Sequence, residues 1–118
     1  MMGSRVYFQP RNYVLDAIND IKELQNGKGT FSDNEKGKIG FIVRLYATKY
    51  EFQFTVTDIG MNRCRVEIEI VGEVRNKEEK VLREFALLDS AMAANTQVEL
   101  MKLKQTEDEA GGEKGDIS

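Results

Sequence analysis

Two runs of strictly alternating apolar and polar residues in the middle of the chain limit its fold most. Phe52, Phe54 and Val56 alternate with glutamine and threonine. Between residues 63 and 70, apolar side chains at every second position are separated by arginines and glutamates. Successive side chains of a β-strand point to opposite faces, so each run gathers its apolar residues on one face. A sheet of this kind needs other elements to cover that face.

Helical patterns on both sides of these runs predict the cover. From Val14 to Leu24, apolar residues recur at spacings of three and four, which is typical of an amphipathic helix. Residues 77–104 contain no glycine or proline, which favours one long C-terminal helix. The sequence therefore predicts an α+β fold in the order strand, helix, about four strands, long helix. We expect an antiparallel sheet of four or five strands, with both helices packed on one face.

A change of apolar parity marks a turn inside this sheet. The apolar positions are odd up to Leu45 and even from Phe52 onward. A one-residue shift turns every side chain of a strand to the other face. We therefore expect a tight turn or a bulge near residues 48–50.

Length and charge distribution suggest one domain with an acidic end. The chain has 118 residues and a net charge of −3. Residues 105–118 hold five acids, one lysine and three glycines, so we predict a single domain over residues 1–104 and a disordered acidic tail over residues 105–118. Subtracting the tail's −4 from −3 leaves a body near +1, which predicts no nucleic-acid partner.

Two further features concern the compartment. No apolar run approaches the roughly 20 residues that a membrane-spanning helix needs, so we predict no membrane partner. The single cysteine, Cys64, excludes an internal disulfide framework and suits a reducing cytoplasm.

The sequence contains no recognisable catalytic pattern. It has no histidine, which removes the usual near-neutral general base and most zinc sites. Cys64 has the parity of the neighbouring core positions, and Glu67 and Glu69 share their strand face with arginines. The sequence thus predicts no catalytic residue, no metal and no cofactor, and we expect a protein that is not an enzyme.

The C-terminal helix carries two apolar stripes. At about 1.5 Å per residue, residues 77–104 would span roughly 40 Å, whereas a six-residue strand spans about 20 Å. One stripe, which contains Phe85, suits the sheet. The other stripe is the predicted interface and consists of Leu87, Ala91, Ala94, Val98 and Met101. It resembles a short heptad seam in which alanines permit close helix approach. Two interpretations stay open: one wide buried arc with a frayed end, or packing against a second copy in a homodimer.

Part of the sequence resembles a known family. The stretch Val-Tyr-Phe-Gln-Pro-Arg-Asn-Tyr-Val-Leu-Asp-Ala-Ile resembles the opening strand and first helix of START-like, helix-grip (SRPBCC) proteins. The segment from Asp33 through Lys36-Gly37-Lys38-Ile39 into long strands and a closing helix is similar to their sheet. The order of elements also resembles TATA-binding-protein-like folds. A helix-grip resemblance implies a cavity for lipids or other apolar ligands between sheet and final helix. A TATA-like resemblance implies a concave sheet face for DNA, against which Glu51, Glu67 and Glu69 argue.

Two functions follow as hypotheses. The first is a self-associating protein-interaction module, indicated by the second helix stripe and by a strand over residues 39–47 that is apolar on both faces. The alternative is a small apolar-ligand binding protein of helix-grip type. In that case we expect Phe41, Phe52, Phe54 and Phe85 to line the layer between sheet and helix.

Overall fold

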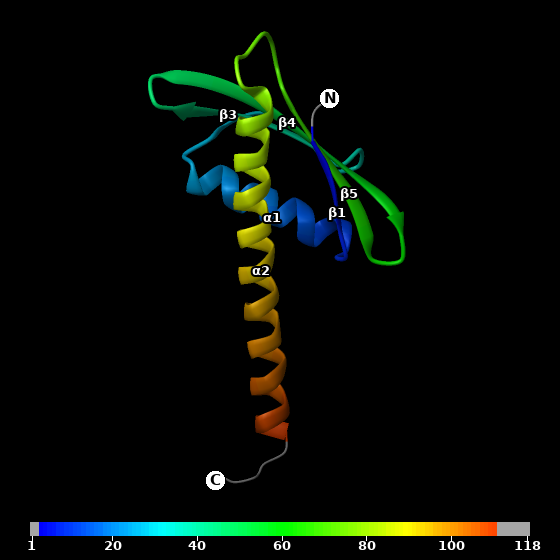
Figure 1. Ribbon diagram of the computed structural model, residues 1–118. Coiled ribbons are helices and arrows are strands. Elements are labelled where there is room, and N and C mark those ends of the chain that lie inside the picture. Colours follow the sequence, from blue (N-terminus) through cyan, green and yellow to red (C-terminus); the bar gives the residue numbers. More distant parts are fainter. Residues whose placement is uncertain (1–2, 111–118) are drawn as a thin grey trace.

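The computed structural model describes residues 3–110, and the side chains of residues 3–95. Five strands form one antiparallel sheet, in the order β1-β5-β4-β3-β2, and two helices accompany it (Figure 1). The elements are β1 (Ser4–Tyr7), α1 (Arg11–Leu24), β2 (Lys28–Asp33), β3 (Lys38–Leu45), β4 (Thr48–Gly60), β5 (Arg63–Ile70) and α2 (Lys77–Ala110). The predicted α+β class and order of elements are confirmed.

One face of the sheet is buried and the other is largely exposed. Burial alternates residue by residue along the whole of β5, and Phe52, Phe54 and Val56 of β4 are buried in the same rhythm. Helix α1 packs on β3, β4 and β5, while α2 packs on α1 and β5. Both helices therefore cover the same face, as the alternation predicts.

The end of α1 is fixed by two residues that break the helix. Asn26 adopts a left-handed conformation (φ 55°), and the Gly27 amide donates to the Lys22 carbonyl at 2.7 Å. This arrangement closes the last turn of the helix. It also places Gln25, the residue just after α1, beside α2.

The turn predicted near residues 48–50 lies two residues earlier. Leu45 pairs with Thr48, so Tyr46 and Ala47 form a two-residue hairpin loop between β3 and β4. In such a loop the paired residues are three positions apart, which changes the parity of the inward-facing positions. The parity change therefore predicted a real turn, but it could not fix its position.

Helix α2 is continuous from Lys77 to Ala110 and, at about 1.5 Å per residue, roughly 51 Å long. Residues 105–110, which were assigned to a disordered tail, are helical. The rest of that tail, residues 111–118, lies outside the described residues. The first part of α2 packs on the body as far as Met92 and Asn95. The helix then continues past α1, away from the sheet (Figure 1).

Candidate functional site

A fully buried carboxylate lies between the two helices. Glu84 of α2 has 0% of its surface exposed, and it is the one buried charged side chain in the part of the chain that the structure describes. It is three residues from Val81 and four from Leu88, which are both core residues. These spacings put Glu84 on the apolar side of the helix.

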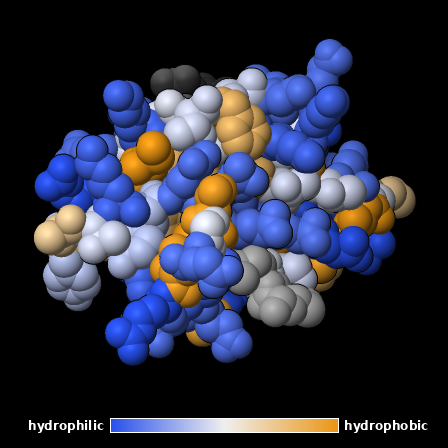
Figure 2. Space-filling view, turned by 90° about the horizontal axis from the view of Figure 1, so that it is seen from above, coloured by the Kyte–Doolittle hydropathy of each residue, from blue (hydrophilic) through white to orange (hydrophobic). Residues whose placement is uncertain are grey.

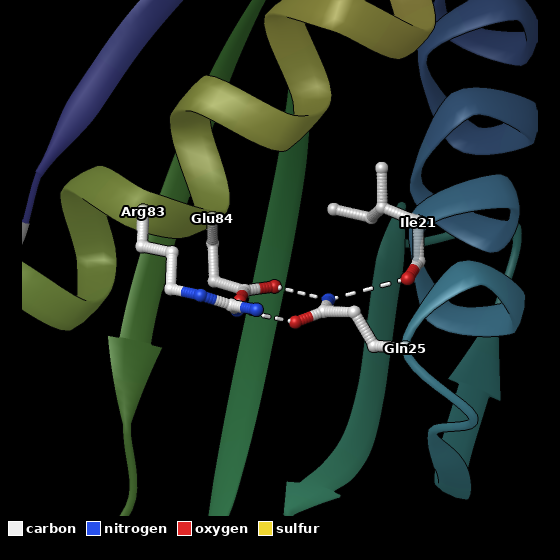
Figure 3. Close-up of polar contacts among 4 residues, drawn as sticks. All are labelled: Ile21, Gln25, Arg83 and Glu84. Carbon is white, nitrogen blue, oxygen red and sulfur yellow. Dashed lines mark hydrogen bonds and ion pairs between the residues drawn. The ribbon is translucent and has the colours of Figure 1, made fainter. Parts of the chain in front are cut away.

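Glu84, Gln25 and Arg83 form a closed ring of hydrogen bonds, which we call the Glu84 cluster (Figure 3). The Gln25 amide Nε2 donates to Glu84 Oε1 at 2.8 Å and to the Ile21 carbonyl at 3.2 Å. Arg83 Nη1 donates to Glu84 Oε2 at 2.9 Å and to Gln25 Oε1 at 2.5 Å. Both carboxylate oxygens thus have a donor, which a buried carboxylate requires.

Burial dominates the electrostatics of this cluster. Desolvation raises the pKa of Glu84 above its ordinary value, while the Gln25 hydrogen bond and the Arg83 charge act in the opposite direction. The Arg83 side chain is 46% exposed, so the cluster reaches the surface on one side. Chemically, the arrangement can join α1 to α2 and can hold or release one proton. Perturbed carboxyl groups of this kind occur in functional sites and in structural ion pairs alike.

The sequence did not predict this cluster, although the position of Glu84 within an apolar stripe pointed to a buried side chain. Glu84 interrupts an apolar stripe at a position where a buried side chain is expected. Its partner Gln25 is 59 residues away in the sequence, and no local pattern connects the two.

A second polar contact ties the edge strand β1 to α2. The Tyr7 hydroxyl donates to Asp89 Oδ1 at 2.6 Å, and Arg5 forms an ion pair with the same carboxylate. The Arg5 guanidinium also lies 4.7 Å from the centre of the Phe85 ring. Burial, followed by the Asp89 contact, raises the pKa of Tyr7. This contact therefore holds an edge strand against the long helix.

The four predicted ligand-binding phenylalanines lie together in the core. Each of Phe41, Phe52, Phe54 and Phe85 is at most 1% exposed. The Phe41 ring centroid lies 5.2 Å from that of Phe54 and 6.4 Å from that of Phe52. Ligand binding by these residues stays a prediction, and their burial means that the core would have to open for it.

The predicted interface stripe divides into three parts. Leu87 and Ala91 are partly buried against the core of their own chain. Ala94 is exposed. The side chains of Val98 and Met101 lie outside the described residues. The role of the stripe as an interface stays a prediction.

Possible metal-binding groups and membrane-spanning helices are both lacking among the described residues. Among residues 3–95, whose side chains the structure describes, no group of three cysteine, aspartate or glutamate residues could hold a metal ion. None of the described helices is long and apolar enough to cross a membrane.

Comparison with known proteins gives a likeness of fold. No protein-family model and no curated protein matches the sequence. Among solved structures, the chain is similar to the di-domain ARO/CYC protein StfQ from the steffimycin biosynthetic pathway, with 11% identity and a TM-score of 0.54. The match covers 78% of this chain but only 43% of StfQ. Because StfQ has a helix-grip fold, the likeness supports the helix-grip resemblance at the level of the fold. The TATA-like resemblance stays a prediction.

This comparison corrects one expectation. The prediction that the chain is not an enzyme is wrong as an exclusion, because StfQ is an ARO/CYC cyclase and therefore an enzyme. The prediction relied on the lack of a motif in the sequence. Function belongs to sites assembled on a fold, and such sites can draw on residues far apart in the chain.

Proposed function

We propose that the protein is a self-associating binding protein that forms a homodimer through the interface stripe of α2. One observation carries the proposal. Asn95 donates from Nδ2 to Asp20 of α1 at 3.1 Å, and α2 then continues for fifteen residues, 96–110, beyond the rest of the molecule (Figure 1).

A projecting helix of this length has a physical need for a partner. Isolated helices shorter than about 12–15 residues are marginal in water, because most helical stability in proteins comes from packing an apolar face. The interface stripe offers such a face from Ala91 to Met101 with heptad spacing. A second copy fits it most simply, because a two-fold axis pairs the same stripe from both chains.

The proposal is tested by placing charges in the stripe. The double variant Ala94→Glu/Val98→Glu buries four like charges in the proposed dimer, and each buried unpaired charge costs several kcal/mol. We expect the wild-type chain to be a dimer by sedimentation equilibrium. The double variant should be monomeric over about a hundredfold range of concentration.

Ala93→Glu is the matched control. Ala93 is exposed and lies one residue from Ala94, about 100° around the helix and therefore off the stripe. This variant should remain dimeric, and circular dichroism should show native helix content in all three proteins. A wild-type chain that is monomeric at the highest concentration would refute the proposal.

The likeness to StfQ favours a second candidate function, the binding of an apolar ligand between sheet and helices. We infer that a ligand in this layer would displace the ring contacts of Phe41 with Phe52 and Phe54. Titration with a fatty acid, followed by the NMR signals of these rings, tests the idea. Saturable shifts confined to the core rings support it. Unchanged ring signals at the solubility limit of the fatty acid exclude it for that class of ligand.

A further inference from the structure

The tip of the β3–β4 hairpin carries a residue that costs stability. Tyr46, in the two-residue loop, has φ 60°, although loops of this kind favour glycine, asparagine or aspartate at positive φ. Its side chain is 102% exposed, so no packing within the chain offsets the strain. Strained residues in folded proteins cluster at binding and catalytic sites.

A second unfavourable feature lies at the same tip. Arg44 of β3 pairs directly with Lys49 of β4, and both are exposed on the open face of the sheet. Like charges directly opposite one another destabilise a sheet. Within the part of the chain that the structure describes, neither residue takes part in an ion pair. Glu51, two residues from Lys49 on the same strand, is the nearest acid along the chain and pairs with Ile42.

A negatively charged partner at the tip would relieve the repulsion between Arg44 and Lys49, and packing against the Tyr46 ring would offset part of the backbone strain. The partner would lie between Arg44 and Lys49 and against the Tyr46 ring. Tyr50, the residue after Lys49, has the parity of the helix-covered face, and Lys80 Nζ at the start of α2 lies 5.0 Å from its ring centre, whereas Arg44 and Lys49 lie on the opposite, open face. Seen from above, apolar residues of this face are separated by hydrophilic ones (Figure 2).

The chain itself contains a segment of the required charge at the other end of α2. Its five acids are Glu107, Asp108, Glu109, Glu113 and Asp116, with Lys114 as the one base between residues 105 and 118. Within one copy, the acidic segment cannot reach the hairpin tip. Lys80 and Ala110 are separated by about 45 Å of helix, whereas the six residues from Ala110 to Asp116 reach at most roughly 22 Å. A partner's acidic segment is under no such limit.

We propose that the two copies pair their α2 helices in antiparallel orientation, so that the acidic end of each binds the Arg44–Tyr46–Lys49 tip of the other. This inference rests on the proposed homodimer and adds its orientation and a second contact. Lys80 and Asp108 each lie fourteen residues from Ala94. An antiparallel seam centred on Ala94 therefore sets Lys80 beside the partner's Asp108. From there the eight residues to Asp116, which reach at most roughly 29 Å, would pass around the end of the hairpin to Arg44 and Lys49 on the open face. A parallel seam would leave the acidic end about 45 Å away.

Disulfide trapping tests the orientation. Full-length Lys49→Cys and Gly112→Cys proteins are mixed and oxidised under mild conditions. We expect a cross-linked heterodimer, and no cross-link when Arg65→Cys replaces Lys49→Cys at the other end of the same sheet face. The native Cys64 is fully buried and does not compete. Cross-linking of Gly112→Cys only to itself would show a parallel dimer and overturn the inference.

Charge reversal tests the contact. Arg44→Glu/Lys49→Glu should weaken dimerisation at least about tenfold at low salt, and much less at high salt, because screening removes the attraction. The control Arg63→Glu/Arg65→Glu makes the same change in net charge at the far end of β5 and should leave the dissociation constant unchanged. Equal effects of the two variants would contradict the inference.

Tyr46→Gly gives a signature that a purely structural role would not produce. In the monomeric Ala94→Glu/Val98→Glu background, the substitution should raise the midpoint of thermal unfolding, since glycine accepts positive φ. In the wild-type background it should weaken dimerisation. If the wild type dimerises but none of these tip variants alters its affinity, the tip contact is refuted and the homodimer stands. If the wild type is monomeric, both the homodimer and the tip contact are refuted.

Discussion

At the scale of single residues, Glu84 stands out because its carboxylate is fully buried and burial of a charge costs free energy. A buried carboxylate loses its hydration, and Gln25 and Arg83 replace only part of it, so its pKa is raised. The folded state therefore binds a proton more tightly than the unfolded state. Stability falls as the pH rises from the ordinary carboxyl pKa to the raised one, and above this window the full cost remains.

Replacing this carboxylate with an amide should stabilise the protein at neutral pH. In Glu84→Gln, the new amide can pair with the Gln25 amide, while Arg83 turns to solvent. Because no charge is buried, we expect a gain on the order of 1 kcal/mol at pH 7. The gain should shrink as the pH falls toward the ordinary carboxyl pKa. Chemical unfolding of both proteins at several pH values measures it.

The companion variant Arg83→Met should act in the opposite direction. It leaves Glu84 with the Gln25 donor alone, so stability at pH 7 should fall. A Glu84→Gln protein that is less stable than wild type at pH 7, with an unchanged pH dependence, would show that the ion pair outweighs desolvation.

At the scale of elements, the turns are where close packing selects particular residues. Gly37, between β2 and β3, has φ 69°, and a Cβ at this position would lie 2.3 Å from the Val56 carbonyl oxygen. In the same turn, the Val56 amide donates a hydrogen bond to the Gly37 carbonyl oxygen at 2.7 Å. Gly72, after β5, has a similar φ of 88° but nothing within 4 Å of such a Cβ. The two glycines thus share a backbone conformation and differ in the space around them.

Alanine substitutions at Gly37 and Gly72 distinguish the energetic cost of a steric clash from the cost of positive φ. We expect Gly72→Ala to lower the free energy of unfolding by about 1 kcal/mol, which is the cost of positive φ. Gly37→Ala should cost about 1–3 kcal/mol more, because the methyl group meets backbone that cannot move aside. Equal losses in urea unfolding would mean that the β2–β3 turn relaxes away from β4.

Local sequence patterns predicted some features of these elements and not others. Alternation along β5 and the apolar spacing of α1 predicted their buried faces, because both periods are properties of the backbone itself. The hairpin loop was misplaced by two residues, because Tyr46 is not a residue that marks positive φ. The Glu84 cluster could not be predicted, because Gln25 and Glu84 meet only after the helices cross.

At the scale of the whole molecule, the long helix sets the shape. The molecule measures 61 × 33 × 22 Å along its principal axes, and α2 extends well past the layer of sheet and α1 (Figure 1). Asn95 of α2 contacts Asp20 of α1, and beyond this point the helix runs past α1 and away from the sheet (Figure 1). The body and the projecting half of α2 therefore have separable roles.

Ending the chain after Asn95 should separate these roles in practice. We expect the shortened protein to unfold cooperatively, with a thermal midpoint within a few degrees of full-length protein diluted to the monomeric state. It should no longer dimerise. Loss of cooperative unfolding would show that residues 96–118 contribute to the fold of the body.

The sequence by itself determined the strands, both helices and the face that each turns inward, because these depend on periodicities of two and 3.6 residues along the chain. It also shows that acidic residues are concentrated at the C-terminal end of the chain. Only the tertiary structure decided that Glu84 meets Gln25 and that the Phe41 ring contacts those of Phe52 and Phe54. It likewise decided the two-residue length of the β3–β4 loop, which sets Arg44 opposite Lys49. These contacts depend on strand register or on the crossing of two helices, and a pattern of neighbouring residues encodes neither.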